Sequence, residues 1–182
     1  MTNIAFRLLL TFNATSLLLV VFFAQNKMDL AHFFPTYERL AEVPKLISYL
    51  AYLSVPVLLT GVSIWLSSFL GFDEFKQGDV QSIEHANNSF LPSYLGYFFV
   101  AIGVSDWTTL WFVYVVLFAF TFLSQALYFN PLFLLYGYEF YNIKTRSGVA
   151  VFLISRHRYR RPDDVSIKEA NRINNYTFIE KS

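Results

Sequence analysis

The first three quarters of the chain alternate long apolar stretches with short polar connections. Four apolar runs cover residues 8–24, 46–70, 90–104 and 107–130, and none of them contains a charged side chain. A helix needs roughly 20 mostly apolar residues to cross the hydrocarbon core of a bilayer. The pattern therefore predicts a bundle of four transmembrane helices over residues 1–136.

The first of these runs also has the general form of a signal peptide. Its cleavage site would place Phe22 at a position where a small residue is required. We therefore expect residues 8–24 to remain in the protein as an uncleaved span.

A few small or polar residues inside the runs predict helix–helix contacts. Ser63 and Ser67 have the small-xxx-small spacing that lets two helices approach closely. Gly96 and Gly103 lie one heptad apart, and we expect the same role for them. Asn13, in the first run, is expected to form a hydrogen bond between helices.

Three further polar or helix-breaking residues mark the ends of spans. Asp106 precedes Trp107 at a tight break between two apolar runs, and we expect it to be a helix N-cap. Pro131 should kink or end the last span because it lacks an N–H group. We expect Asn130 to mark the inner membrane boundary and residues 132–136 to form an interfacial segment.

The pattern changes after Tyr136. Residues 138–145 partly alternate, residues 149–154 are rich in branched side chains, and Gly148 lies in the turn between them, which predicts a β-hairpin. From Pro162 to about Ile173, acids come first and bases later, which favours a short helix. The rest is expected to be a tail.

Together these patterns predict an all-α membrane protein. It consists of the four-helix bundle over residues 1–136 and a small cytosolic domain, a β-hairpin plus a short helix, over residues 137–182. The acidic connection over residues 71–89 is expected to be a solvated loop.

Composition and charge support a membrane location and suggest an orientation. Apolar residues make up 55% of the chain and aromatic residues 20%, more than one small water-soluble core could bury. Nine of the fourteen Lys and Arg residues follow Tyr136, although the net charge is only +1. Positive charge near span ends stays in the cytoplasm, so we expect both termini there, with residues 25–45 outside.

The dense charge cluster of the chain comprises Arg156, Arg158, Arg160 and Arg161. Three interpretations remain open: contact with anionic lipid headgroups, docking of an acidic partner, or contact with nucleic acid. The hairpin beside it has apolar residues on both faces, including Phe152 and Ile154. Because a lone hairpin cannot bury both faces, these two residues and the four arginines are predicted to bind a partner or lipids.

No catalytic chemistry is evident in the sequence. There is no cysteine, and the three histidines lie far apart without a metal-binding spacing. We therefore expect no enzyme activity, no metal and no cofactor. An alternative to a scaffold is a small oligomeric channel or transporter accessory subunit, lined by Thr60, Ser63 and Ser67.

The layout resembles a known family. The four spans, the segment Asn130-Pro-Leu-Phe-Leu-Leu-Tyr-Gly-Tyr-Glu-Phe-Tyr141, the hairpin to Ile154 and the basic segment before Pro162 resemble the membrane subunit of the bacterial Kiwa anti-phage defence system. The resemblance implies an inner-membrane homo-oligomer, expected to be a tetramer, that senses infection at the envelope. It also implies recruitment of a cytosolic DNA-binding partner, with no direct binding of nucleic acid by this chain. The sequence therefore predicts a non-enzymatic sensor and scaffold.

Overall fold

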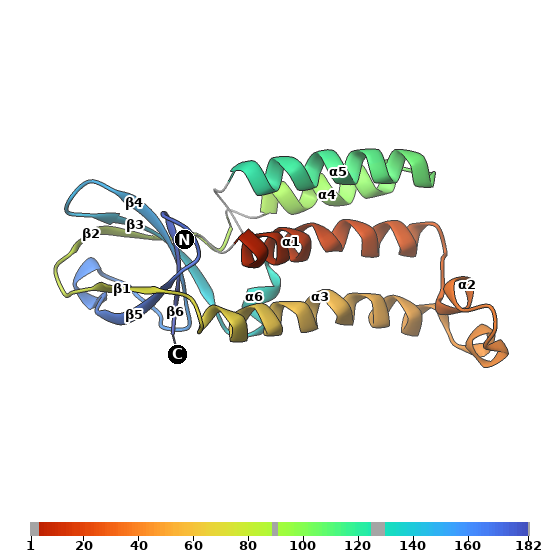
Figure 1. Cartoon of the computed structure of the whole chain (residues 1–182), viewed down its shortest axis with the longest axis horizontal. Helices are drawn as coiled ribbons and strands as arrows, with labels where there is room; N and C mark the ends of the chain where they lie inside the picture. The colour runs from red at the N-terminus through yellow and green to blue at the C-terminus, as the bar shows by residue number, and fades with distance from the viewer. Residues whose placement is uncertain (1–3, 89–90, 125–129, 182) are drawn as a thin grey trace.

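The computed structural model describes residues 4–88, 91–124 and 130–181 of the chain. Figure 1 shows an elongated molecule with a helical bundle at one end and a β-sheet at the other. The short α2 (Leu30–Phe33) and the 3₁₀ helix η1 (Glu38–Glu42) follow α1 at the end of the bundle away from the sheet. The bundle itself consists of α1 (Ile4–Gln25), α3 (Lys45–Ser67), α4 (Leu91–Gly103) and α5 (Trp107–Ser124).

α1 is the central helix of the bundle. It packs against α3, α4 and α5. In the most apolar 18-residue stretch of each helix, 50% of the residues of α1 are buried, whereas only 11% of those of α5 are. The outer helices instead leave large apolar side chains exposed, among them Trp65 on α3 and Phe112 on α5. Exposed apolar surfaces of this kind are typical of proteins that contact a membrane or another protein.

Three helices, α1, α3 and α5, are long and apolar enough to cross a membrane. α4 is also apolar but has only 13 residues. At 1.5 Å per residue it spans roughly 20 Å, less than the roughly 30 Å of a bilayer core. The end of the fourth predicted span, residues 125–129, lies outside the described residues. The number of crossings therefore stays a prediction.

At the other end, the chain forms a six-stranded mixed sheet in the order β1-β5-β6-β4-β3-β2. Neighbouring strands pair antiparallel except β4 and β6, which are parallel. The prediction of an all-α fold is therefore wrong. The strands are β1 (Phe72–Phe75), β2 (Val80–His85), β3 (Glu139–Thr145), β4 (Ala150–Ser155), β5 (Ile167–Arg172) and β6 (Thr177–Glu180).

Three local predictions fail with the all-α fold. The segment 71–89, expected as a loop, contains β1 and β2. The helix expected after Pro162 is a 3₁₀ turn, η2 (Pro162–Asp164), followed by β5, and the expected tail contains β6. The hairpin of β3 and β4 is present, with Gly148 at φ +85° in its turn.

The missed strands are short, and most of their partners lie far away in sequence. Phe72 of β1 lies opposite Asn171 of β5, and Ile83 of β2 lies opposite Ile143 of β3. Strand formation depends on such neighbours more than on local propensity. β1 and β2 connect α3 to α4, so the sheet is assembled from segments on both sides of the α4–α5 pair.

The sheet is buried on both faces at its centre, along β4 and β6, whereas β1 and β2 are largely exposed. Side chains alternate between the faces of a strand, so Phe140 and Phe152 belong to one core while Tyr141 and Leu153 belong to another. The first core also includes residues of α1 and of α6 (Leu132–Leu135), namely Phe6, Leu10, Leu132 and Phe133. A continuous apolar core therefore joins the sheet to the bundle.

The opposite end of the bundle is rich in exposed aromatic rings, including Phe34, Tyr37 and Trp111. Such rings are typical of a membrane–water interface. At this end the Asp106 carboxylate accepts the backbone N–H of Thr109 at 2.9 Å, which confirms the expected N-cap of α5. Hydrogen bonds from the Thr109 backbone and hydroxyl lower the pKa of Asp106.

Candidate functional site

The four arginines of the predicted cluster lie in one exposed loop that follows β4. The guanidinium of Arg156 lies over the ring of Tyr138, 4.7 Å from its centre. Arg158 Nε donates to Glu139 Oε1 at 2.8 Å. The loop therefore presents cationic side chains next to the start of β3, and two of them are held by contacts to that segment.

The same loop is fixed to the end of β6 by Glu180, which is only 7% exposed. The Tyr159 hydroxyl lies 3.0 Å from both carboxylate oxygens of Glu180, and His157 Nδ1 lies 3.0 Å from one of them. The Ser155 hydroxyl also donates to this carboxylate. The hydrogen-bonding capacity of this buried carboxylate is used by residues of the loop, so we interpret Glu180 as an anchor of the loop and not as a ligand-binding group.

Glu139 forms the second anchor of the loop. Burial raises its pKa, but the hydrogen bond from Tyr141 and the charge of Arg158 outweigh this effect, so the pKa of Glu139 lies below its ordinary value. Burial and the bond to Glu139 raise the pKa of Tyr141 to about 12. At neutral pH the carboxylate is therefore charged and the hydroxyl remains a donor.

These contacts define what the loop can do chemically. It combines a fixed backbone with the exposed side chains of Arg158, Arg160 and Arg161, which suits binding of anionic groups. Among the described residues, no group of three or more His, Asp or Glu side chains could hold a metal ion. The geometry thus favours an electrostatic binding surface.

Phe152 and Ile154, the apolar residues predicted to bind a partner, lie inside the protein. Phe152 is 5% exposed and Ile154 is fully buried. Phe152 stacks on Phe140 with 5.7 Å between ring centres. Both side chains pack in the core between the sheet and the bundle, so they are not accessible to a partner in this structure.

The four residues predicted to pack helices divide into two pairs. Ser63 and Ser67 are buried on α3, and their hydroxyls donate to carbonyl oxygens of the same helix. Among the described residues, an added Cβ at Gly96 or Gly103 would meet no heavy atom of another element within 4 Å, so no close approach seen there depends on them. A Cβ at Gly61 would lie 2.7 Å from the hydroxyl oxygen of Tyr136, a contact that the sequence spacing did not reveal.

A buried polar cluster links α1, α3 and the segment after α5. Asn13 lies 2.8 Å from Thr60 Oγ1, which confirms the expected bond between helices, and Asn130 Nδ2 donates to the same oxygen at 3.1 Å. When the Asn13 carboxamide is oriented so that its nitrogen donates to Pro56 O at 3.0 Å, its oxygen accepts a hydrogen bond from Asn130 Nδ2 at 3.1 Å. Asn130 thus lies buried among the helices, and its expected position at the inner membrane boundary stays a prediction.

The comparison with known families identifies the chain. A family model described as anti-phage protein KwaA matches residues 6–179. The chain belongs to the KwaA family of anti-phage proteins. This confirms the resemblance to the membrane subunit of the Kiwa defence system. No curated protein and no solved structure matches the chain.

Membership of the KwaA family establishes a role in defence against phages. The match includes the bundle and nearly all of the sheet. It therefore covers the polar cluster, the arginine loop and the anchor Glu139, and it ends one residue before Glu180.

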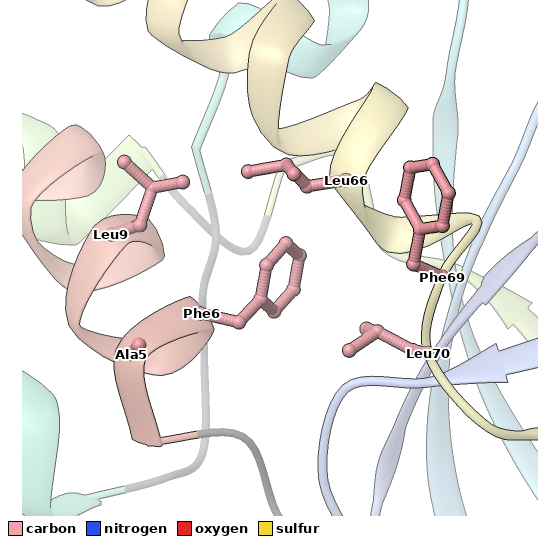
Figure 2. A pocket seen from close by; sticks show the side chains of 6 residues that line it. All are labelled: Ala5, Phe6, Leu9, Leu66, Phe69 and Leu70. Atoms are coloured by element: carbon pink, nitrogen blue, oxygen red, sulfur yellow. The ribbon is translucent and has the colours of Figure 1, made fainter.

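A groove of about 380 Å³ lies where α1 and α3 of this KwaA-family chain approach the sheet. Figure 2 shows hydrocarbon side chains from α1, from α3 and from the turn that follows α3: Ala5, Phe6, Leu9, Leu66, Phe69 and Leu70. These side chains offer no hydrogen bonds, so the groove suits an apolar group and could not orient a polar substrate.

Sequence reasoning missed several residues that organise this region. Glu139 and Glu180 are isolated acids in the sequence, and nothing in their spacing indicates that they meet the arginine loop. Tyr136 and Gly61 lie 75 positions apart, yet they touch. The available signal was Asn130 beside Pro131, because polar, non-helical backbone at membrane depth is tolerated only where protein or water surrounds it.

Proposed function

We propose that this chain is a non-enzymatic sensor and scaffold of an anti-phage defence system, located in the bacterial inner membrane. The bundle detects a disturbance of the membrane during infection, and the sheet carries the signal to a cytosolic DNA-binding partner. The chain acts as a homo-oligomer, with a tetramer as the expected form. The observation that carries this proposal is the core shared by the sheet and the bundle.

The shared core supports signalling because it couples the two parts. Phe6 and Leu10 of α1 pack in the same cluster as Phe152 and Ile154 of β4. A tilt of α1 therefore cannot occur without repacking the sheet, since interiors are close-packed and transmit displacement. A sensor needs such a path between its membrane part and its output part.

The layout also supports an orientation with both termini in the cytoplasm. The first residues of α1 pack near the sheet, so both ends of the chain lie at the sheet end of the molecule. That end carries the arginine loop and nine of the fourteen Lys and Arg residues of the chain. Retention of positive charge in the cytoplasm favours this side for the sheet.

The docking surface in this proposal is the arginine loop, and its partner presents acidic groups. Anionic headgroups of the inner leaflet would compete for the same arginines. The channel interpretation is not favoured by the geometry. Thr60, Ser63 and Ser67 are buried within the chain, so they have no free surface with which to line a pore between copies.

The test replaces Arg156, Arg158, Arg160 and Arg161 together by Gln. We expect loss of copurification with the proposed cytosolic DNA-binding partner, and loss of phage protection, while membrane insertion stays normal. The matched control replaces the exposed basic residues Lys144, Arg146 and Lys168 by Gln and should keep both. Full protection and full copurification in the arginine variant would contradict docking through this loop.

A further inference from the structure

The segment from Asn130 to Tyr136 lies against α3, in the part of the bundle that adjoins the sheet. Asn130 is 1% exposed and bonds to Thr60, seven residues before the end of α3. At 1.5 Å per residue, this contact lies roughly 10 Å inside α3. The buried polar groups of the segment are satisfied by protein partners on α1 and α3.

Two contacts of this segment converge on one stretch of α3. Asn130 Nδ2 donates to Thr60 Oγ1 at 3.1 Å, and the Tyr136 hydroxyl donates to the carbonyl oxygen of Val57 at 2.8 Å. The three heavy atoms nearest to a Cβ built on Gly61 all belong to Tyr136. Glycine at position 61 therefore leaves the space in which the tyrosine hydroxyl reaches Val57.

The stretch that receives these contacts begins with Pro56 in the middle of α3. A proline removes one hydrogen bond of the helix and favours bending at that point. The missing bond would join the nitrogen of Pro56 to the carbonyl oxygen of Tyr52, so the least constrained turn of α3 lies directly before the stretch that the segment binds. A change in the tilt of the outer half of α3 would be concentrated at this turn.

On its other side, the segment leads directly and rigidly into the sheet. The N–H of Tyr138 donates to Phe133 O at 3.1 Å, and the N–H of Gly137 donates to Leu134 O at 3.0 Å. With Gly137 at φ +77°, this is a Schellman motif that ends α6. Strand β3 begins at Glu139, so no slack separates the segment from the sheet.

We infer that the segment 130–136 is a latch that ties the proline-containing stretch of α3 to strand β3, so that movement of α3 is passed to the sheet. The use of this latch in phage sensing rests on the proposed function. The latch itself does not, because it makes a claim about the order of β3 that holds in purified protein.

The test measures hydrogen exchange of the β3 amides in purified protein. Tyr136→Phe removes the bond to Val57, and Gly61→Ala displaces the hydroxyl that makes it. Each variant should speed exchange of β3 about fivefold, which corresponds to about 1 kcal/mol, the usual net value of one hydrogen bond. Both substitutions break the same contact, so their effects should not add. The β3 amides of the double variant should exchange at about the same rate as those of each single variant.

Two control variants remove comparable groups elsewhere. Gly96→Ala adds a methyl group where no heavy atom lies within 4 Å. Tyr97→Phe removes a hydroxyl that lies 3.2 Å from Thr121 Oγ1, a contact between α4 and α5. Both should leave exchange of β3 unchanged.

The outcomes separate the latch from the proposed function. If β3 exchanges at the same rate in Tyr136→Phe and Gly61→Ala as in the two controls, the latch is refuted, whatever the variants do to phage protection. Independent, multiplying effects in the double variant would also refute it. Faster exchange together with undiminished protection would keep the latch and overturn its use in sensing.

Discussion

The bundle and the sheet of this KwaA-family chain are stabilised in different ways. The sheet buries apolar side chains on both faces, pairs its strands through backbone hydrogen bonds and places its buried carboxylate among several donors. The bundle buries only its central helix to a comparable extent, and its outer helices expose large apolar side chains. The sheet has the organisation of a water-soluble domain, whereas the bundle is suited to an apolar solvent.

This difference indicates which regions of the protein should tolerate substitutions and which should not. In lipid, an exposed side chain exchanges protein contacts for contacts with acyl chains, so it adds little to stability. In the sheet, each buried side chain is held by the hydrophobic effect and by close packing. Substitutions should therefore matter most at the junction of the two regions and least on the outer face of α5.

The largest effect is expected for Ile154→Asp at the junction. It places a charge in the core shared by the sheet and the bundle, where Ile154 is fully buried. A loss of more than about 4 kcal/mol follows from burying an unpaired charge, and we expect no monodisperse protein in detergent by gel filtration. Val149→Asp, at an exposed position in the turn of the same hairpin, should purify normally. Normal yield of Ile154→Asp would contradict the shared core.

Removal of an anchor of the arginine loop should have the next largest effect. Glu180→Leu leaves the hydroxyls of Ser155 and Tyr159 without their acceptor, at a cost of about 2 kcal/mol. Thermal unfolding should shift downward, and trypsin should cut the loop faster. Glu169→Gln, which removes an exposed pairing with Lys181, should change neither. Equal trypsin rates for both variants would show that Glu180 does not hold the loop.

A smaller effect concerns pH and the second anchor. The pKa of Glu139 is lowered in the folded protein, so its stabilising contribution is present above the ordinary value of 4.5 and is lost as the pH falls through the folded value. The contribution is below about 1 kcal/mol because Arg158 is well exposed. Unfolding midpoints measured from pH 7 to 3 should fall less steeply for Glu139→Gln than for the unchanged protein. Parallel curves would contradict the ion pair.

The smallest effect is expected on the exposed outer face of α5. Phe112 on α5 is 71% exposed, so Phe112→Ala should leave the unfolding midpoint in detergent within the error of measurement. A clear decrease in the unfolding midpoint would mean that another copy of the chain covers this face of α5. Gel filtration of the same samples, at two protein concentrations, would then show a change in oligomeric state.

The sequence predicted the bundle better than the sheet, for a physical reason. Long apolar helices are defined locally, and the expected spans at 8–24 and 46–70 overlap α1 and α3 closely. The strands of the sheet depend on partners that the local pattern does not show. The segment from Pro162 to about Ile173 places acids first and bases later, as a helix would, yet residues 167–172 pair with β1 and β6 and form a strand.

The sequence predicted the charged residues of the candidate site, but it did not predict which residues they contact. Four arginines in six residues are visible in the sequence, and the structure places them in one exposed loop. Phe152 and Ile154 were assigned to an open hairpin face because the strands that complete the sheet were not recognised. Tyr136 and Gly61 meet only because the chain turns back into the bundle after α5, which no spacing rule indicates.

The most direct test of this account locates the two regions relative to the membrane. The chain has no cysteine, so single cysteines can report exposure to a thiol reagent that does not cross membranes. In cells with a permeabilised outer membrane, Thr36→Cys, beyond α2, should be labelled, whereas Lys144→Cys, in the sheet, should be labelled only after lysis. Labelling of Lys144→Cys before lysis, or recovery of the protein in the soluble fraction without detergent, would contradict a membrane bundle with a cytosolic sheet.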